Sequence, residues 1–188
     1  MVSNFSLLHL ITSKAPLEEI AAALNSLTDH GGLFSAHTEK DDGGRTALHH
    51  AAIDASPDVV KTLLDSIPNE MMQTVLQMKT NRGSTPVFIA AKNPSGEVMR
   101  LLLSKVSDRK LLLEMICEGR ESDQATSFQG AATNPSAGVI ELLLAAVGDS
   151  KEPAEIIKQK DNVGWTIVHH AARHGTVEVF TYTEEILI

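Results

Sequence analysis

The sequence predicts an all-α protein in which short helices stack into a solenoid, and three observations carry this prediction. A short segment recurs along the whole chain at an interval of about 40 residues. Each of its middle copies is followed by a second segment whose apolar residues have helical spacing. The composition is 43% apolar but only 4% aromatic, so the core has to be aliphatic, which suits helices better than strands.

The recurring segment sets the boundaries of the repeats. Its copies begin at Ser6, Thr46, Thr85, Thr126 and Thr166, at intervals of 40, 39, 41 and 40 residues. We therefore expect a single domain over residues 1–188, made of repeats at approximately 1–40, 41–79, 80–120, 121–160 and 161–188, the last of them incomplete.

Each copy is expected to open a pair of helices. The leading Ser or Thr is a good N-cap, and Pro86 falls at the next position, where a missing N–H costs nothing. The second helix carries apolar pairs four residues apart, such as Val59-Val60 with Leu63-Leu64. Turn residues, such as Ser56-Pro57, separate the two helices.

The interval leaves surplus residues after the second helix of three repeats. They fall at 68–76, 107–116 and 151–157, where a proline or a capping residue stands near the start and apolar pairs follow. We expect each surplus segment to form an extra short helix inserted between repeats.

The recurring segment also carries a family signature. Thr46-Ala47-Leu48-His49-His50-Ala51-Ala52 and the copy at 166–172 resemble the Thr-Pro-Leu-His-x-Ala-Ala signature of ankyrin repeats. The Asp-x-x-Gly-x motif that precedes this signature in the family is matched at 41–45 and 161–165. The resemblance covers nearly the whole chain and implies an ankyrin-like solenoid of about five helix-turn-helix repeats. The long period is similar to that of ankyrin proteins of intracellular bacteria.

The chain departs from the ankyrin pattern in three ways. Its period is about 40 residues instead of 33. The fourth repeat has Gln124 where glycine is expected and Gln129 where histidine is expected. The last repeat decays after Phe180, and Thr183 and Glu184 occupy the positions of the leucine pair. The first repeat lacks the Ala-Ala pair and is expected to cap the N-terminal end of the stack.

Charge, cysteine content and hydropathy narrow the classes of function. The formal net charge is −8 and no basic run is present, which disfavours binding to nucleic acid or to anionic membranes. Cys117 is the single cysteine, so no intramolecular disulfide can form. No apolar stretch approaches the roughly 20 residues that a membrane span needs, and the N-terminus lacks the features of a signal peptide. We expect a cytoplasmic protein that acts as a monomer and does not insert into membranes.

Histidines and the cysteine are the residues that could suggest chemistry. The pairs His49-His50 and His169-His170 stand three repeats apart, on the order of 25 Å at about 8–10 Å for each packed helix, which is too far for one zinc site. His170 and His174 could share a helix face, but no third ligand is evident. Cys117 occupies an apolar position of an inserted helix, where cysteine behaves as a small hydrophobe. We therefore expect no catalytic residue, no metal and no cofactor, and we expect the protein not to be an enzyme.

The resemblance places the partner-binding surface at the tips of the turns and on the concave face lined by the first helices. The residues carried over by position follow the turn motif or the Ala-Ala pair, where exposed side chains are expected. They are Asp42, Arg45, Ile53, Asp54, Asn81, Arg82, Ser84, Lys92, Asn93, Ser122, Asp123, Thr133, Asn134, Asn162, Val163, Trp165, Arg173 and His174. Trp165 and Arg45 stand out because Trp and Arg are enriched at interface hot spots. The alternative for each residue is plain solvated surface and, for Trp165, packing against the next turn.

The first hypothesis for function is a non-catalytic scaffold that binds a partner protein through the concave face and the turn tips. The alternative is a targeting or substrate-recognition module of a larger protein, such as a bacterial effector that acts in the cytoplasm of a host cell. The apolar C-terminal residues 186–188 favour this alternative, because the end of a solenoid is expected to be polar. These residues are expected either to fold back onto the stack or to continue into a longer chain.

Overall fold

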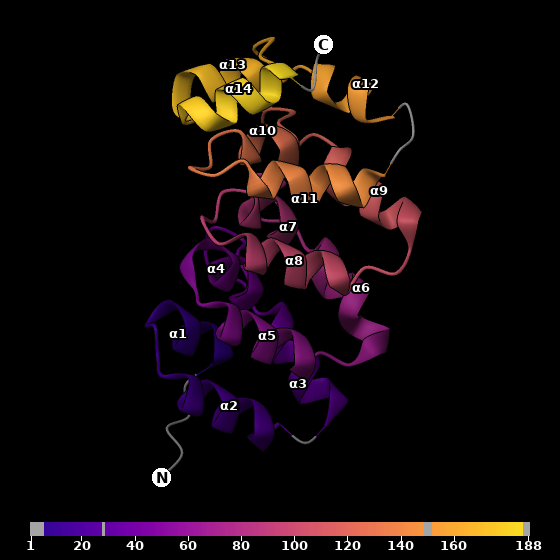
Figure 1. Cartoon of the computed structure of the whole chain (residues 1–188). Coiled ribbons are helices and arrows are strands. Elements are labelled where there is room, and N and C mark those ends of the chain that lie inside the picture. Colours follow the sequence, from indigo (N-terminus) through magenta and orange to yellow (C-terminus); the bar gives the residue numbers. More distant parts are fainter. Residues whose placement is uncertain (1–5, 28, 149–151, 186–188) are drawn as a thin grey trace.

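The computed structural model describes residues 6–27, 29–148 and 152–185, and in these ranges the chain forms fourteen α-helices and no strand. The helices run from the N-terminal to the C-terminal end as a single stack (Figure 1). The prediction of an all-α solenoid is confirmed.

The helices form three columns along this stack (Figure 1). The first column holds α1 (Leu7–Thr12), α4 (Ala47–Asp54), α7 (Pro86–Ala90), α10 (Ser127–Ala131) and α13 (Ile167–His174). The second column holds α2 (Leu17–Ser26), α5 (Pro57–Ser66), α8 (Gly96–Ser104), α11 (Gly138–Val147) and α14 (Val177–Glu185). The third holds α3 (His30–Thr38), α6 (Asn69–Gln77), α9 (Arg109–Cys117) and α12 (Glu152–Lys158). Consecutive helices of the first column pack on one another, as do α2, α5, α8 and α11.

The first helices begin where their capping residues predict. The hydroxyl group of Thr85 accepts a hydrogen bond from the Phe88 amide at 3.2 Å. Thr46, Thr126 and Thr166 form capping boxes, in which the side chain three residues later also bonds the backbone of the cap. Each cap satisfies backbone N–H groups that would otherwise lack a partner at the start of the helix.

The predicted apolar stripes form one continuous core between the columns. Leu63 and Leu64 of α5, Leu102 of α8 and Leu143 of α11 are completely buried, as are the alanine pairs of α4 and of residues 90–91 and 131–132. Burying one leucine side chain contributes about 1.5–3 kcal/mol. Because each stripe packs against the next repeat, the stack gains this energy only when neighbouring repeats are present.

The three inserted helices expected from the surplus residues are present as α6, α9 and α12, although residue 151 of the last segment lies outside the described residues. A fourth inserted helix, α3, was not predicted. Asp29 caps it through a 2.7 Å hydrogen bond from the Gly32 amide. It buries His37, whose Nε2 lies 2.9 Å from the hydroxyl oxygen of Ser66 on α5.

The last repeat is less degraded than its sequence indicates. Helix α14 continues to Glu185, and Thr183 is completely buried in the position of a leucine while Glu184 is exposed. The Thr183 hydroxyl donates a 2.9 Å hydrogen bond to the carbonyl oxygen of Phe180. This bond removes the cost of burying the polar group. The predicted fates of residues 186–188 lie outside the described residues.

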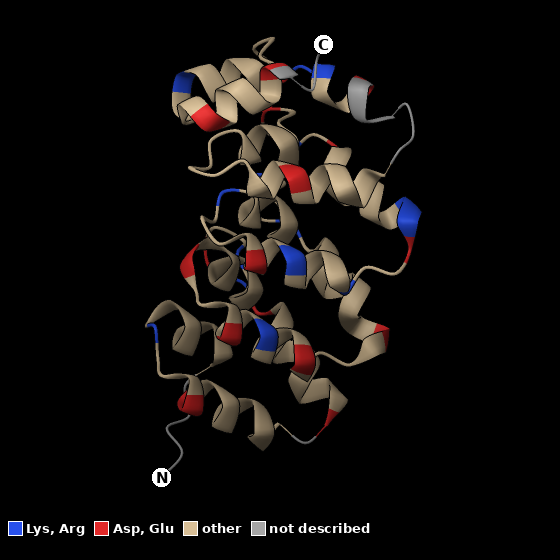
Figure 2. Ribbon diagram, in the orientation of Figure 1, with Lys and Arg blue, Asp and Glu red and all other residues tan. Residues whose placement is uncertain are grey.

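Charges of both signs mix along the second column (Figure 2). Examples are the ion pairs of Lys61 with Asp65, at 2.7 Å on α5, and of Arg100 with Glu97, at 3.3 Å on α8. Among the described helices, none combines the length and the apolar character that crossing a bilayer demands.

Candidate functional site

The turns that precede the first helices are fixed by an aspartate. Oδ1 of Asp41 accepts hydrogen bonds from the amides of Gly43 and Arg45 at 2.9 and 2.8 Å. Its Oδ2 lies 2.8 Å from Nε2 of His50 on α4. Burial alone would raise the pKa of Asp41, but the bonds from Arg45, His50 and Gly43 outweigh it and lower this pKa below its ordinary value.

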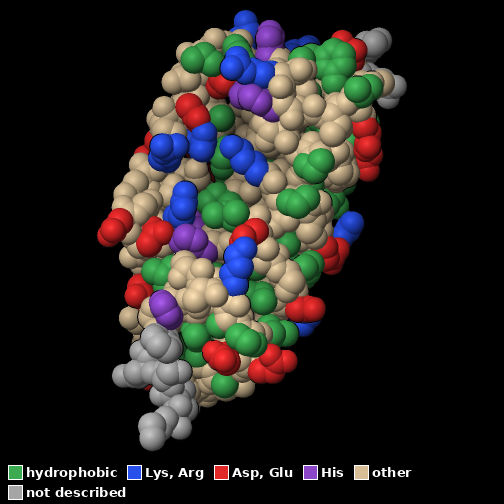
Figure 3. All heavy atoms as spheres, turned by 90° about the vertical axis from the view of Figure 1, so that its left-hand side faces the viewer, with side chains coloured by type: hydrophobic (Ala, Val, Ile, Leu, Met, Phe, Trp, Pro, Cys, Tyr) green, Lys and Arg blue, Asp and Glu red, His purple; other side chains and the backbone are tan. Residues whose placement is uncertain are grey.

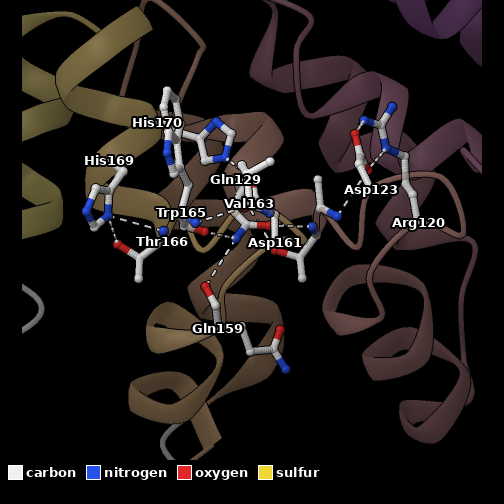
Figure 4. A network of polar contacts seen from close by, with 12 residues as sticks. Arg120, Asp123, Gln129, Gln159, Asp161, Val163, Trp165, Thr166, His169 and His170 are labelled. Carbon is white, nitrogen blue, oxygen red and sulfur yellow. Dashed lines mark hydrogen bonds and ion pairs between the residues drawn. The ribbon is translucent and has the colours of Figure 1, made fainter.

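The last repeat builds the same turn from Asp161. Its Oδ1 accepts from the amides of Val163 and Trp165 at 3.1 and 2.8 Å, and its Oδ2 lies 2.9 Å from Nε2 of His170 (Figure 4). The second histidine of each signature pair therefore orients a turn. This arrangement leaves the neighbouring turn residues Asn162 and Val163 in solvent.

The two middle turns use other residues for the same purpose. In the third repeat, the Thr80 hydroxyl oxygen accepts from the Arg82 and Ser84 amides at 3.3 and 3.1 Å. The turn of the fourth repeat is one residue longer. Its Arg120 amide bonds the carbonyl oxygen of Ala125, whereas in the third repeat the Thr80 amide bonds that of Ser84. Gln124 adopts a left-handed φ of 59° there, and Arg120 pairs with Asp123 across the turn.

The first histidine of the signature links one repeat to the next. His49 is completely buried; its Nδ1 lies 2.8 Å from the Thr46 hydroxyl oxygen, and its Nε2 lies 3.1 Å from the Ser84 carbonyl oxygen in the following turn. Burial lowers the pKa of His49 to about 4, so its ring is neutral at pH 7. The ring therefore bonds the cap of its own helix and also the turn of the next repeat.

Gln129 forms the equivalent bonds in the fourth repeat, where it stands in place of the signature histidine. Its Oε1 accepts from the Thr126 amide at 2.7 Å, and its Nε2 donates to the carbonyl oxygens of Gln159 and Trp165 at 3.1 and 3.0 Å (Figure 4). The carbonyl and amino ends of one glutamine thus replace the two nitrogens of the histidine ring.

Three of the predicted binding residues are buried, which corrects the expectation that they are exposed. Asn93 donates to the carbonyl oxygen of Ala52 in the previous repeat at 3.1 Å, and Asn134 donates to that of Asn93 at 2.6 Å. Ser84 is enclosed between His49 and the fourth turn, and its hydroxyl oxygen accepts from Arg120 at 3.3 Å. All three side chains are used inside the stack, the two asparagines by backbone carbonyls and Ser84 by Arg120, so a partner cannot reach them.

The remaining predicted residues lie at the surface that combines the first column with the turns at 40–46, 79–85, 119–126 and 160–166, which we call the inner face. The exposed ones are Asp42, Arg45, Ile53, Asp54, Asn81, Arg82, Lys92, Ser122, Asn162, Val163, Arg173 and His174. Asp123, Thr133 and Trp165 are partly buried. Asp54 pairs with Lys14 at 2.5 Å.

Trp165 is held against its own repeat. Its ring stacks on His169 and meets the edge of His170, with ring centroids 6.4 and 5.3 Å apart, and Arg173 lies 5.0 Å from its centre. Figure 4 shows the ring beside these histidines. The Trp165 side chain is therefore a fixed, partly exposed aromatic surface at the C-terminal end of the inner face.

Three further residues of this surface, Phe88, Ile89 and Arg120, were not predicted from the sequence. Together with Arg45, Arg82 and Lys92 they line an open hollow of about 460 Å³ between the second, third and fourth repeats. One signal was available: Phe88 occupies the position of the signature histidine, where it cannot form the usual hydrogen bonds.

Within the described ranges, no group of three or more His, Cys, Asp and Glu side chains is arranged to hold a metal ion. Cys117 is partly buried and packs against the core.

A family model described as ankyrin repeats, in three copies, matches residues 19–114, which is half of the chain. The chain belongs to the ankyrin repeat family. No curated protein matches it. Ankyrin repeats generally mediate contacts between proteins and are generally not enzymes.

Proposed function

We propose that this ankyrin protein is a non-catalytic scaffold that binds a partner protein through its inner face. The observation that carries the proposal is the hydrogen bonding that orders the turns, which present exposed side chains there. The Arg45 and Trp165 amides are each bonded to an aspartate that a histidine orients, and the turns are bonded to one another.

The bonds between turns extend this order along the stack. The Asn81 amide donates to the carbonyl oxygen of Gly43 at 3.0 Å, and the Asn162 amide donates to that of Asp123 at 2.9 Å. A surface that is already ordered loses little conformational entropy when a partner binds. The proposed partner therefore meets a pre-formed surface that spans several repeats.

Trp165 and Arg45 are the proposed anchors. A tryptophan or arginine at the centre of an interface commonly contributes more to affinity than its neighbours. Trp165 keeps part of its ring accessible although His169 and His170 fix its orientation. Arg45 is exposed, and its amide is held by Asp41.

The test is capture of partners from a lysate on immobilised protein, followed by mass spectrometry. Trp165→Ala and Arg45→Ala should each weaken capture while helicity by circular dichroism stays unchanged. Lys61→Ala and Arg100→Ala on the second column are the matched controls, because they remove exposed side chains of similar size from the other side. Capture that survives both inner-face variants and fails with the controls contradicts the proposal.

A targeting module of a larger protein, such as an effector, would use the same surface, so these variants test that role as well. A reading frame that continues beyond Ile188 would favour it. We further propose that the protein acts in the cytoplasm, a reducing compartment that suits its single cysteine, and that it acts as a monomer.

A further inference from the structure

The middle of the inner face carries a positively charged hollow in a protein whose net charge is −8. Arg45 comes from the second turn, Arg82 from the third, Lys92 from the residues just after α7 and Arg120 from the fourth turn. Figure 3 shows basic side chains gathered around a hollow at the centre of this face. No carboxylate is among the side chains that line it.

Three of these cations have no carboxylate partner among the described residues. In the part of the chain that the structure describes, Arg45, Arg82 and Lys92 form no ion pair, whereas Arg120 pairs with Asp123. Burial and the nearby charge of Arg120 lower the pKa of Lys92, and the charge of Asp123 opposes them only in part. Several positive charges that line one hollow repel one another and raise the energy of the free protein, and a bound anion would relieve that repulsion.

The hollow also has an apolar floor. Ile53 at the end of α4 is 40% exposed, and Ile89 and the ring of Phe88 lie beside it. The Arg120 guanidinium and the Lys92 ammonium lie 4.3 and 5.5 Å from the centre of the Phe88 ring. A ligand that fits must therefore bring negative charge for the rim and an aliphatic group for the floor.

The surroundings favour a short peptide segment over a nucleic acid. Asp42, Asp54 and Glu121 each adjoin a lining residue in the sequence (Gly43, Ile53 and Arg120), and all three are exposed. A nucleic acid carries its charges continuously and needs a basic stripe, so it would meet these carboxylates on leaving the hollow. A peptide can place its own carboxylates at the hollow alone, and the arginine fork binds a carboxylate through two parallel hydrogen bonds.

We propose that this hollow binds an acidic segment of a partner protein, in which Asp or Glu side chains pair with Arg45, Arg82 and Lys92 and an aliphatic side chain rests on Ile53 and Ile89. The proposal rests on the proposed scaffold function and specifies the chemistry of its partner.

The test selects binders from a displayed library of random dodecapeptides on the immobilised full chain, and measures the affinity of synthetic copies by fluorescence polarisation. Selected peptides should be enriched in Asp and Glu beside Leu, Ile or Val. Their affinity should fall at least tenfold in Arg45→Ala, Arg82→Ala and Lys92→Ala and should decrease as salt rises. Lys61→Ala and Arg100→Ala should leave the affinity unchanged.

Enrichment of neutral or basic peptides, failure to select any peptide, or affinities that the three variants leave unchanged would overturn the proposal. So would tighter binding of a phosphoserine-containing peptide or of a single-stranded DNA oligonucleotide of equal charge. If these results overturn the acidic-segment proposal while Trp165→Ala still abolishes capture of a partner from lysate, the scaffold function stands and only its assignment to this hollow fails.

Discussion

The guanidinium carbon of Arg120 lies 4.3 Å from the centre of the ring of Phe88, which replaces the signature histidine of the third repeat. Arg120 also pairs with Asp123 and donates to the hydroxyl oxygen of Ser84 at 3.3 Å. The ring and the arginine therefore join the third and fourth repeats, as His49 and Gln129 join their own neighbours by hydrogen bonds.

Replacing Arg120 with alanine should destabilise the fold, because a cation–π contact and a partly buried ion pair are lost together. We expect a loss of about 1–3 kcal/mol in urea denaturation. Arg82→Ala is the control, since that exposed side chain has no described ion pair and should cost less than about 0.5 kcal/mol. A double-mutant cycle with Phe88→Leu should give a coupling of about 0.5–2 kcal/mol, and a coupling near zero would contradict this link.

Glutamine should replace His49 with little loss, whereas leucine should not. Gln129 shows that a glutamine in this position bonds both its own cap and the next turn. Leucine would leave the Thr46 amide and the Ser84 carbonyl without their partner, which costs about 1–3 kcal/mol. Thermal or urea unfolding of His49→Gln and His49→Leu measures the difference, and equal stability of the two variants would show that these bonds contribute nothing.

The stability of the protein should fall as the pH drops from 6.5 to 4. Burial lowers the pKa of His37 and of His49 from 6.5 to about 4, so in this window the unfolded chain holds more protons than the folded one. Each histidine then changes the free energy of unfolding by at most about 1.4 kcal/mol per pH unit. The stability that its neutral form contributes is fully present only above pH 6.5.

Urea titrations across this pH range measure the slope, and a double variant isolates the two histidines. His37→Leu keeps the Ser66 hydroxyl satisfied, because that group also donates to the Leu63 carbonyl at 2.7 Å. Together with His49→Gln it should flatten the dependence between pH 6.5 and 4. An unchanged slope would mean that other groups cause it.

Two glycines with the same backbone conformation should differ in their tolerance of alanine. Gly44 and Gly164 both have a left-handed φ, of 74° and 84°. A methyl group on Gly44 would stand 2.8 Å from the amide nitrogen of Asn81, but one on Gly164 would meet nothing within 4 Å. Gly164→Ala should therefore cost about 1 kcal/mol for its φ alone, and Gly44→Ala should cost clearly more. Equal costs would indicate that the turn at Gly44 does not pack closely against the backbone of Asn81 in the next turn.

Local patterns predicted the columns but not every helix. The apolar pairs of α5 and α8 and the capping threonines of the first column depend only on neighbouring residues, so they can be identified in the sequence. Helix α3 could not be identified in this way, because residues 30–38 include two glycines and have no apolar stripe. Its one local signal is the capping Asp29.

The surface was harder to predict because it depends on how repeats stack. Asn93 and Asn134 follow alanine pairs and look like exposed polar residues, yet each reaches back to carbonyl oxygens of the preceding repeat. The basic hollow unites Arg45, Arg82 and Arg120 from three different turns. No basic run exists in the sequence because these charges meet only after folding.

The most direct test of the scaffold account is hydrogen–deuterium exchange of the full chain with and without its captured partner. The account predicts that binding slows exchange in the inner-face turns at 40–46, 79–85, 119–126 and 160–166, and leaves the exchange of α5, α8 and α11 unchanged. Slower exchange confined to these second-column helices, with the turns unaffected, would contradict it.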